Sequence, residues 1–124
     1  MKASIGIILS IIFSLAIFTP SSLAHGSLEP KHGGIVKEAH DMVFELVRKD
    51  NSVIIYVTDH GEDYSTAKLT GNIIVLSSGK KVDKSLTPAG GNKMTAEVLI
   101  SDGAKVLIKV KDGEHHPVTI RYSF

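Results

Sequence analysis

The chain has 124 residues, with 14 basic and 13 acidic side chains, six histidines and no cysteine. This length suits one small domain, and the near-neutral charge makes no electrostatic case for nucleic acid, which calls for a basic stripe. The lack of cysteine excludes disulfide bonds and thiolate metal ligands, so apolar burial must hold the fold together.

Residues 1–24 have the pattern of a secretory signal peptide. Lys2 precedes an apolar stretch from Ile5 to Phe18, and Ser22-Leu23-Ala24 supplies the small residues that a signal peptidase accepts. The stretch is shorter than the about 20 residues that a membrane-spanning helix needs, and no later segment could span a membrane. We therefore expect a periplasmic protein with a signal peptide (1–24), a flexible N-terminal arm (25–33) and one β-domain (34–124).

Beyond Pro30 apolar and polar residues alternate with a period of two, which indicates β-strands. The clearest case is the stretch from Ala104 to Val110, where apolar residues alternate with Lys105, Leu107 and Lys109. Pairs such as Ser78-Gly79 and Asp102-Gly103 mark tight turns between the strands. The pattern predicts an all-β fold, either a small antiparallel β-sandwich (Ig-like) or a partly open barrel of seven to eight strands.

Counting strand directions places several histidines at one end of this fold. If each strand crosses the sheet once, the turn at Ala39-His40-Asp41 and the turn at Asp59-His60-Gly61 lie at the same end as residues 112–116. The side chains gathered there would be His40, His60, His115 and His116, with Asp41, Asp59, Glu62, Asp63 and Glu114 beside them.

Imidazoles and carboxylates together suit a divalent ion such as zinc or copper(II). Met42 could add a thioether, although alternation sends it into the core. His115 and His116 are adjacent and would point to opposite faces of a strand, so at most one of them joins a given site. The plainer interpretation is that these are solvated turn residues, and connections that cross between sheets would break the count.

The segment before the first strand offers a second candidate site. Cleavage after Ala24 would make His25 the first residue, whose amine and ring nitrogen form a chelate that favours copper(II). His32 follows seven residues later, before two glycines that allow positive φ or a hinge. Alternatively, the segment is only the start of the domain.

Four stretches resemble a known group of proteins: Pro30–Val36, Asp41–Val47, Tyr56–Gly61 and Leu86–Asn92. They resemble small exported proteins of Gram-negative bacteria that are associated with heavy-metal efflux systems and mostly lack an assigned activity. They are also similar to a β-domain of metal-efflux periplasmic adaptor proteins. The resemblance covers most of residues 30–124 and implies a periplasmic β-domain that handles or senses metal. It maps onto His32 and His60, and it does not extend to His25, His115 or His116.

The sequence carries no nucleophile elbow, phosphate-binding loop or dinucleotide fingerprint, so we expect no enzymatic activity. The predicted function is binding of a divalent transition metal, copper(II) or zinc, for buffering or for delivery to an efflux system. One alternative is a ligand-free protein-docking module, although the loops contain few aromatic residues. Another is a pH-responsive module built from the same histidines. The predicted metal ligands are His25, His32, His40, Asp59, His60, His115 and His116.

Overall fold

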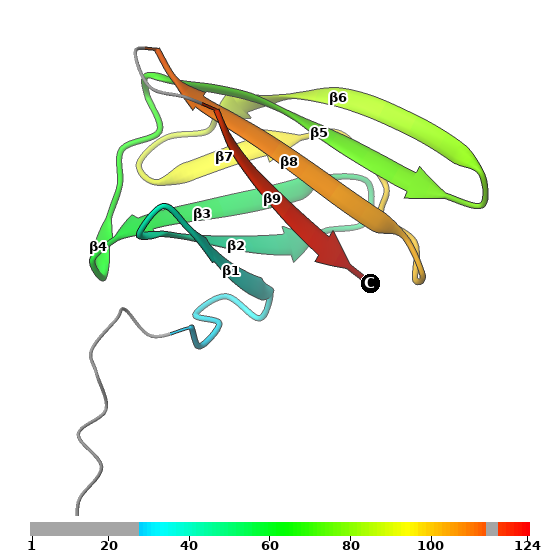
Figure 1. The fold of residues 1–124 in the computed structure, drawn as a ribbon, viewed down its shortest axis with the longest axis horizontal. Helices are drawn as coiled ribbons and strands as arrows, with labels where there is room; N and C mark the ends of the chain where they lie inside the picture. Colours follow the sequence, from blue (N-terminus) through cyan, green and yellow to red (C-terminus); the bar gives the residue numbers. More distant parts are fainter. Residues whose placement is uncertain (1–27, 114–116) are drawn as a thin grey trace, which may run out of the picture.

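The computed structural model describes residues 28–113 and 117–124, which fold into strands joined by short turns (Figure 1). The expected signal peptide, His25, His115 and His116 lie outside these residues. The described residues hold no helix that is long and apolar enough to cross a membrane. The strands are β1 (Ile35–Ala39), β2 (Met42–Arg48), β3 (Val53–Asp59), β4 (Glu62–Asp63), β5 (Leu69–Ser77), β6 (Lys80–Pro88), β7 (Lys93–Ala96), β8 (Lys105–Asp112) and β9 (Val118–Ser123).

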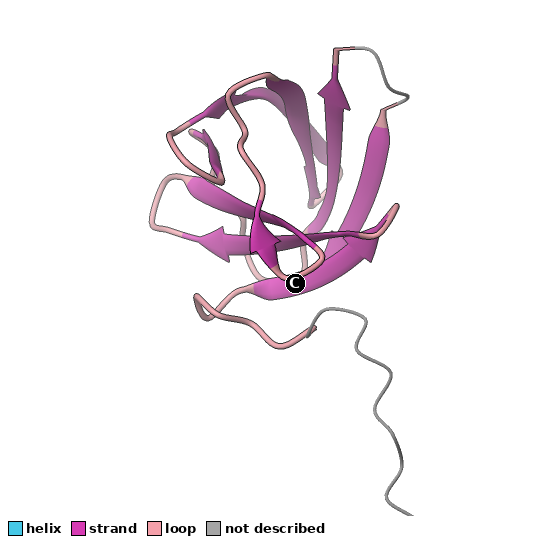
Figure 2. Ribbon diagram, turned by 90° about the vertical axis from the view of Figure 1, so that its left-hand side faces the viewer, coloured by secondary structure: helices cyan, strands magenta, loops and turns pink. Residues whose placement is uncertain are grey.

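All strand pairs are antiparallel, and they form one sheet in the order β1-β2-β3-β7-β6-β5-β8-β9, with β4 paired to β3. The two outermost strands, β1 and β9, lie against each other, so the sheet curls nearly into a closed barrel (Figure 2). The predicted all-β class is confirmed, and of the two predicted architectures the barrel is the one observed. Closure leaves few free strand edges.

Three hairpins are closed by two-residue turns with positive φ at both central residues, the pattern of type I′ turns. These central pairs are His40-Asp41, His60-Gly61 and Ser78-Gly79, with φ between 50° and 81°. Glycine adopts this backbone freely, and histidine and aspartate are among the residues that tolerate it best. The turn twist matches the twist of the flanking strands, which is why these short hairpins form.

The inside of the barrel is filled by the alternate apolar residues of each strand. On β8, Val106, Ile108 and Val110 are buried, as the alternation predicts. The hydroxyl of Tyr122 donates a hydrogen bond of 3.0 Å to the carbonyl of Phe44, and both side chains are buried. This bond joins β9, the last strand of the sheet, to β2, the second strand from the other end, across the core.

Apolar residues alternate from Met94 to Ile100, a pattern that predicts a strand over these residues, but the strand is shorter in the structure. β7 ends at Ala96, which pairs with Val53, the first residue of β3. Beyond Ala96, β3 has no further residue with which β7 could pair. Burial still alternates there, because Val98 and Ile100 are buried while Leu99 is exposed.

Candidate functional site

The turns that carry His40 and His60 lie side by side at one end of the barrel. His40 closes the β1–β2 hairpin and His60 closes the β3–β4 hairpin. Met42, which follows the first turn, pairs with Asp59, which precedes the second. The two histidine turns are therefore neighbours at the same edge of the sheet, as counting strand directions predicts.

This end of the barrel opens into a cavity of about 480 Å³, which we call the mouth. Its polar lining comes from the two turns, from the segment after β4 and from the end of β8. Its apolar lining continues into the barrel core. The polar residues are His40, Asp41, Asp59, His60, Tyr64 and Asp112, and the apolar ones are Met42, Phe44, Leu69, Val110 and Val118.

The side chains of His60 and Asp59 form a hydrogen bond at the mouth, with 2.5 Å between Nδ1 and Oδ1. The Asp59 carboxylate accepts this hydrogen bond in the tautomer whose Nδ1 carries the ring proton. A neutral His60 ring then has its lone pair on Nε2. The His60 side chain is 80% exposed, so Nε2 is open to a ligand from solvent.

Tyr64 and Asp112 form another wall of the mouth. The hydroxyl of Tyr64 donates a hydrogen bond of 3.0 Å to Oδ2 of Asp112. This hydrogen bond raises the pKa of Tyr64, with smaller contributions from burial and from the negative charges of Asp112 and Asp59. The bond ties the segment after β4 to the last residue of β8 and holds the Asp112 carboxylate at the mouth.

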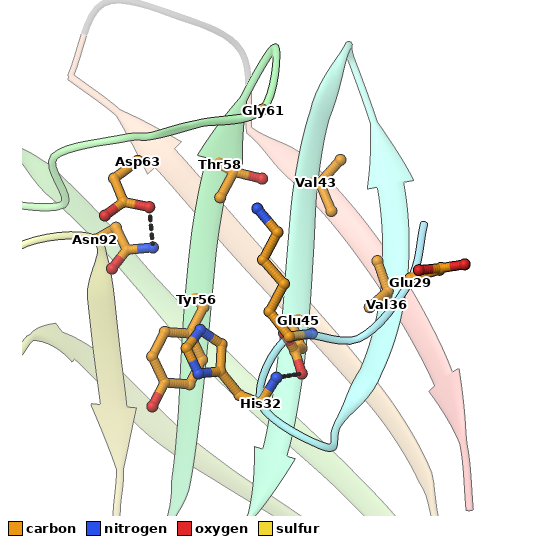
Figure 3. A pocket seen from close by; sticks show the side chains of 11 residues that line it. Glu29, His32, Val36, Val43, Glu45, Tyr56, Thr58, Gly61, Asp63 and Asn92 are labelled. Carbon is orange, nitrogen blue, oxygen red and sulfur yellow. Dashed lines mark hydrogen bonds between the residues drawn. The ribbon is translucent and has the colours of Figure 1, made fainter. Parts of the chain in front are cut away.

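His32 lies elsewhere, on the outer face of the sheet, and is not among the residues that line the mouth. Its ring stacks on Tyr56 of β3, with centroids 3.6 Å apart and planes inclined by 10° (Figure 3). The backbone around it is also held, because the N–H groups of Lys31, His32 and Gly34 donate hydrogen bonds to the Glu45 carboxylate. Residues 31–33, expected as part of a flexible arm, are therefore fastened to the sheet.

The burial of Glu45 was not predicted from the sequence. Alternation places it on the outer face, where a solvated side chain is expected, yet it is only 5% exposed. Its two carboxylate oxygens accept the three backbone hydrogen bonds at 2.8 to 3.0 Å. Gly34 makes this approach possible, since a Cβ there would lie 2.3 Å from the carbonyl oxygen of Leu46. The adjacent glycines after His32 were the available sequence signal for such a close backbone contact.

The structure thus brings together His40, His60 and Asp59 from the predicted ligands and sets His32 apart. Within residues 28–113 and 117–124, no group of three or more histidine, aspartate or glutamate side chains is placed to hold a metal ion. The predicted ligands His25, His115 and His116 lie outside the described residues. The mouth therefore presents two imidazoles and several carboxylates at the rim of one cavity. In comparisons with family models, curated proteins and solved structures, no match to this chain was found.

Proposed function

We propose that this chain is a periplasmic, non-enzymatic protein that binds a divalent transition metal, copper(II) or zinc, at the mouth of the barrel. The first ligands would be the imidazoles of His40 and His60. The metal would be buffered there or passed to an efflux system, as the resemblance of the sequence to efflux-associated proteins implies. The observation that carries the proposal is the adjacency of two histidine turns through the Met42–Asp59 pair.

The Asp59–His60 pair supports this assignment. Histidines that bind metals usually donate their second ring N–H to a carboxylate or carbonyl, which fixes the tautomer and raises the basicity of the ligating nitrogen. In the mouth, Asp59 holds Nδ1 of His60 and leaves Nε2 free.

Two imidazoles fill half of a tetrahedral zinc site, and the remaining ligands would come from carboxylates, from water or from histidines nearby in the chain. Asp112 lines the mouth, and His115 follows it by three residues. His115 or His116 stays a predicted ligand, and the amino-terminal chelate at His25 stays a separate predicted site. Imidazole and carboxylate ligands suit copper(II) and zinc over a soft monovalent ion.

Calorimetric titration of the exported, processed protein with Cu(II) and with Zn(II) tests the proposal. The double variant His40→Ala/His60→Ala is compared with the single variant His32→Ala. His32→Ala is the matched control, because His32 is an exposed histidine outside the mouth. We expect the double variant to lose about tenfold or more in affinity, while His32→Ala keeps the affinity of the parent.

A third form, extended at the amino terminus, separates the chelate at His25 from the mouth. Loss of binding only in the extended form would assign the metal to His25 and contradict the mouth site. Equal and weak binding by all forms would overturn metal binding altogether and favour a docking module.

A further inference from the structure

Cationic side chains gather on the outer face of β6, β5, β8 and β9, four strands that lie side by side in that order (Figure 1). Leu76 of β5 pairs with Lys81 of β6 and with Lys105 of β8, so these three side chains share the outer face. Side chains two residues apart lie on the same face of a strand, and the other outward cations follow along β8 and β9. The five cations of this surface, which we call the basic face, are Lys81, Lys105, Lys109, Lys111 and Arg121.

These cations are exposed, and within the part of the chain that the structure describes none of them forms an ion pair. The ion pairs of residues 28–113 and 117–124 are Arg48–Asp102 and Asp59–His60, and neither lies on the basic face. Asp83 is the one carboxylate at an outward position of these four strands, and it accepts a hydrogen bond of 3.0 Å from Asn72. Five cations therefore face solvent beside a single acid.

Charge is unevenly distributed over the described residues, although the formal charge of the chain is close to zero. Three carboxylates, those of Asp41, Asp59 and Asp112, line the mouth. The outer face of β1 and β2 carries Glu38 and Glu45, as their register with Val43 and Val36 shows. Acids thus line the mouth and the outer face of β1 and β2, while the outer face of β6, β5, β8 and β9 carries five cations beside one acid. Other exposed lysines, such as Lys37, Lys49 and Lys68, lie outside the basic face. Such an arrangement orients the protein in front of a negatively charged surface.

We infer that the basic face docks on an anionic phospholipid surface. The outward positions of the four strands include no aromatic residue, whereas protein-binding hot spots are enriched in tryptophan, tyrosine and arginine. Four of the five cations are lysines, whose flexible ammonium groups suit an array of phosphates better than one shaped partner. Leu76 is 48% exposed between Lys81 and Lys105, where it can enter the headgroup layer while the lysines meet phosphates.

Vesicle co-sedimentation of the processed protein tests this inference in the presence of a chelator, so that its outcome does not depend on metal binding. The vesicles are phosphatidylcholine alone and phosphatidylcholine with about 30% phosphatidylglycerol. The face variant is Lys81→Gln/Lys105→Gln/Lys109→Gln. The matched control, Lys37→Gln/Lys49→Gln/Lys68→Gln, removes the same charge from exposed lysines outside the basic face.

We expect the parent to bind only the anionic vesicles, and to release them when salt rises from about 0.1 M to about 0.5 M. The face variant should lose about tenfold or more in affinity, while the control changes less than about twofold. Equal losses in both variants would overturn the inference, since net charge alone would explain them. Binding to neutral vesicles at the same strength would also overturn it. A third contrary outcome is retention of soluble polyglutamate by the parent, but not by the face variant, without binding to vesicles.

Discussion

The carboxylate of Glu45 accepts a hydrogen bond of 2.8 Å from the backbone N–H of His32, on the outer face of the sheet. The N–H groups of Lys31 and Gly34 share the same carboxylate. This buried side chain thus anchors a segment that otherwise forms no strand, and the stacking of His32 on Tyr56 adds a second contact.

The Glu45→Ala variant should release this segment. Three amides would lose their acceptor, and we expect a decrease of about 1–3 kcal/mol in the free energy of unfolding. Hydrogen exchange of the amides of residues 31, 32 and 34 should accelerate, whereas exchange in β8 should not. The control is Glu38→Ala, an exposed glutamate on β1 that should change stability by less than about 0.5 kcal/mol. Unchanged exchange at those three amides would show that Glu45 does not hold the segment.

Gly34 should be the glycine of this segment that is hardest to replace. A Cβ at Gly34 would lie 2.3 Å from the carbonyl oxygen of Leu46, and backbone must shift to admit it. We expect Gly34→Ala to cost about 1–3 kcal/mol in urea unfolding. At Gly113 a Cβ would meet no atom within 4 Å, so Gly113→Ala serves as the control and should be nearly neutral. Similar losses in both variants would contradict the tight approach of Gly34 to β2.

The raised pKa of Tyr122 predicts how the free energy of unfolding changes at alkaline pH. Burial raises its pKa above the ordinary value of 10.0, and the nearby charge of Glu45 adds to the effect. The folded chain therefore holds this proton more tightly than the unfolded chain does. The resulting stabilisation is fully present below about pH 10 and is lost as pH rises further, by up to about 1.4 kcal/mol per pH unit.

Urea unfolding of the parent and of Tyr122→Phe, at about pH 8 and about pH 11, measures this effect. Near pH 8 the variant should lose about 1 kcal/mol, because the carbonyl of Phe44 loses its donor. Toward pH 11 the parent should lose stability more steeply than the variant does. Parallel pH profiles would mean that the Tyr122 proton does not control the alkaline limit. The Tyr64→Phe variant is measured at the same two pH values for comparison, because Tyr64 is the second tyrosine with a raised pKa.

Strand positions could largely be predicted from the sequence, because alternation reports burial directly, although the alternation up to Ile100 outlasts β7, which ends at Ala96. On β8 the apolar residues Val106, Ile108 and Val110 point inward, while the lysines between them are exposed. The predicted strands, together with the turn residues between them, also place His40 and His60 at one end of the sheet. Each short hairpin reverses the chain, so successive turns alternate between the two ends of the sheet.

Other features depend on contacts between distant segments, and no local pattern encodes them. Closure of the barrel requires β1 to meet β9, and alternation does not distinguish a barrel from a sandwich. Glu45 sits at an outward position, yet the segment around His32 covers it. The basic face combines Lys81 with lysines of β8 through the pairing of β5 with both neighbours, whereas net charge alone suggests no such surface.

Substitutions at His60 can separate the role of this residue in the backbone turn from its proposed role as a metal ligand. His60 has φ of 50°, a conformation that asparagine also tolerates well. His60→Asn should therefore change the free energy of unfolding by less than about 0.5 kcal/mol. A β-branched residue is strained there, and His60→Val should cost about 1–2 kcal/mol. If the imidazole binds metal, His60→Asn should nonetheless weaken Cu(II) and Zn(II) binding about tenfold or more in calorimetry. Metal affinity equal to that of the parent, in a variant with unchanged stability, would mean that His60 is present only because the turn accepts it.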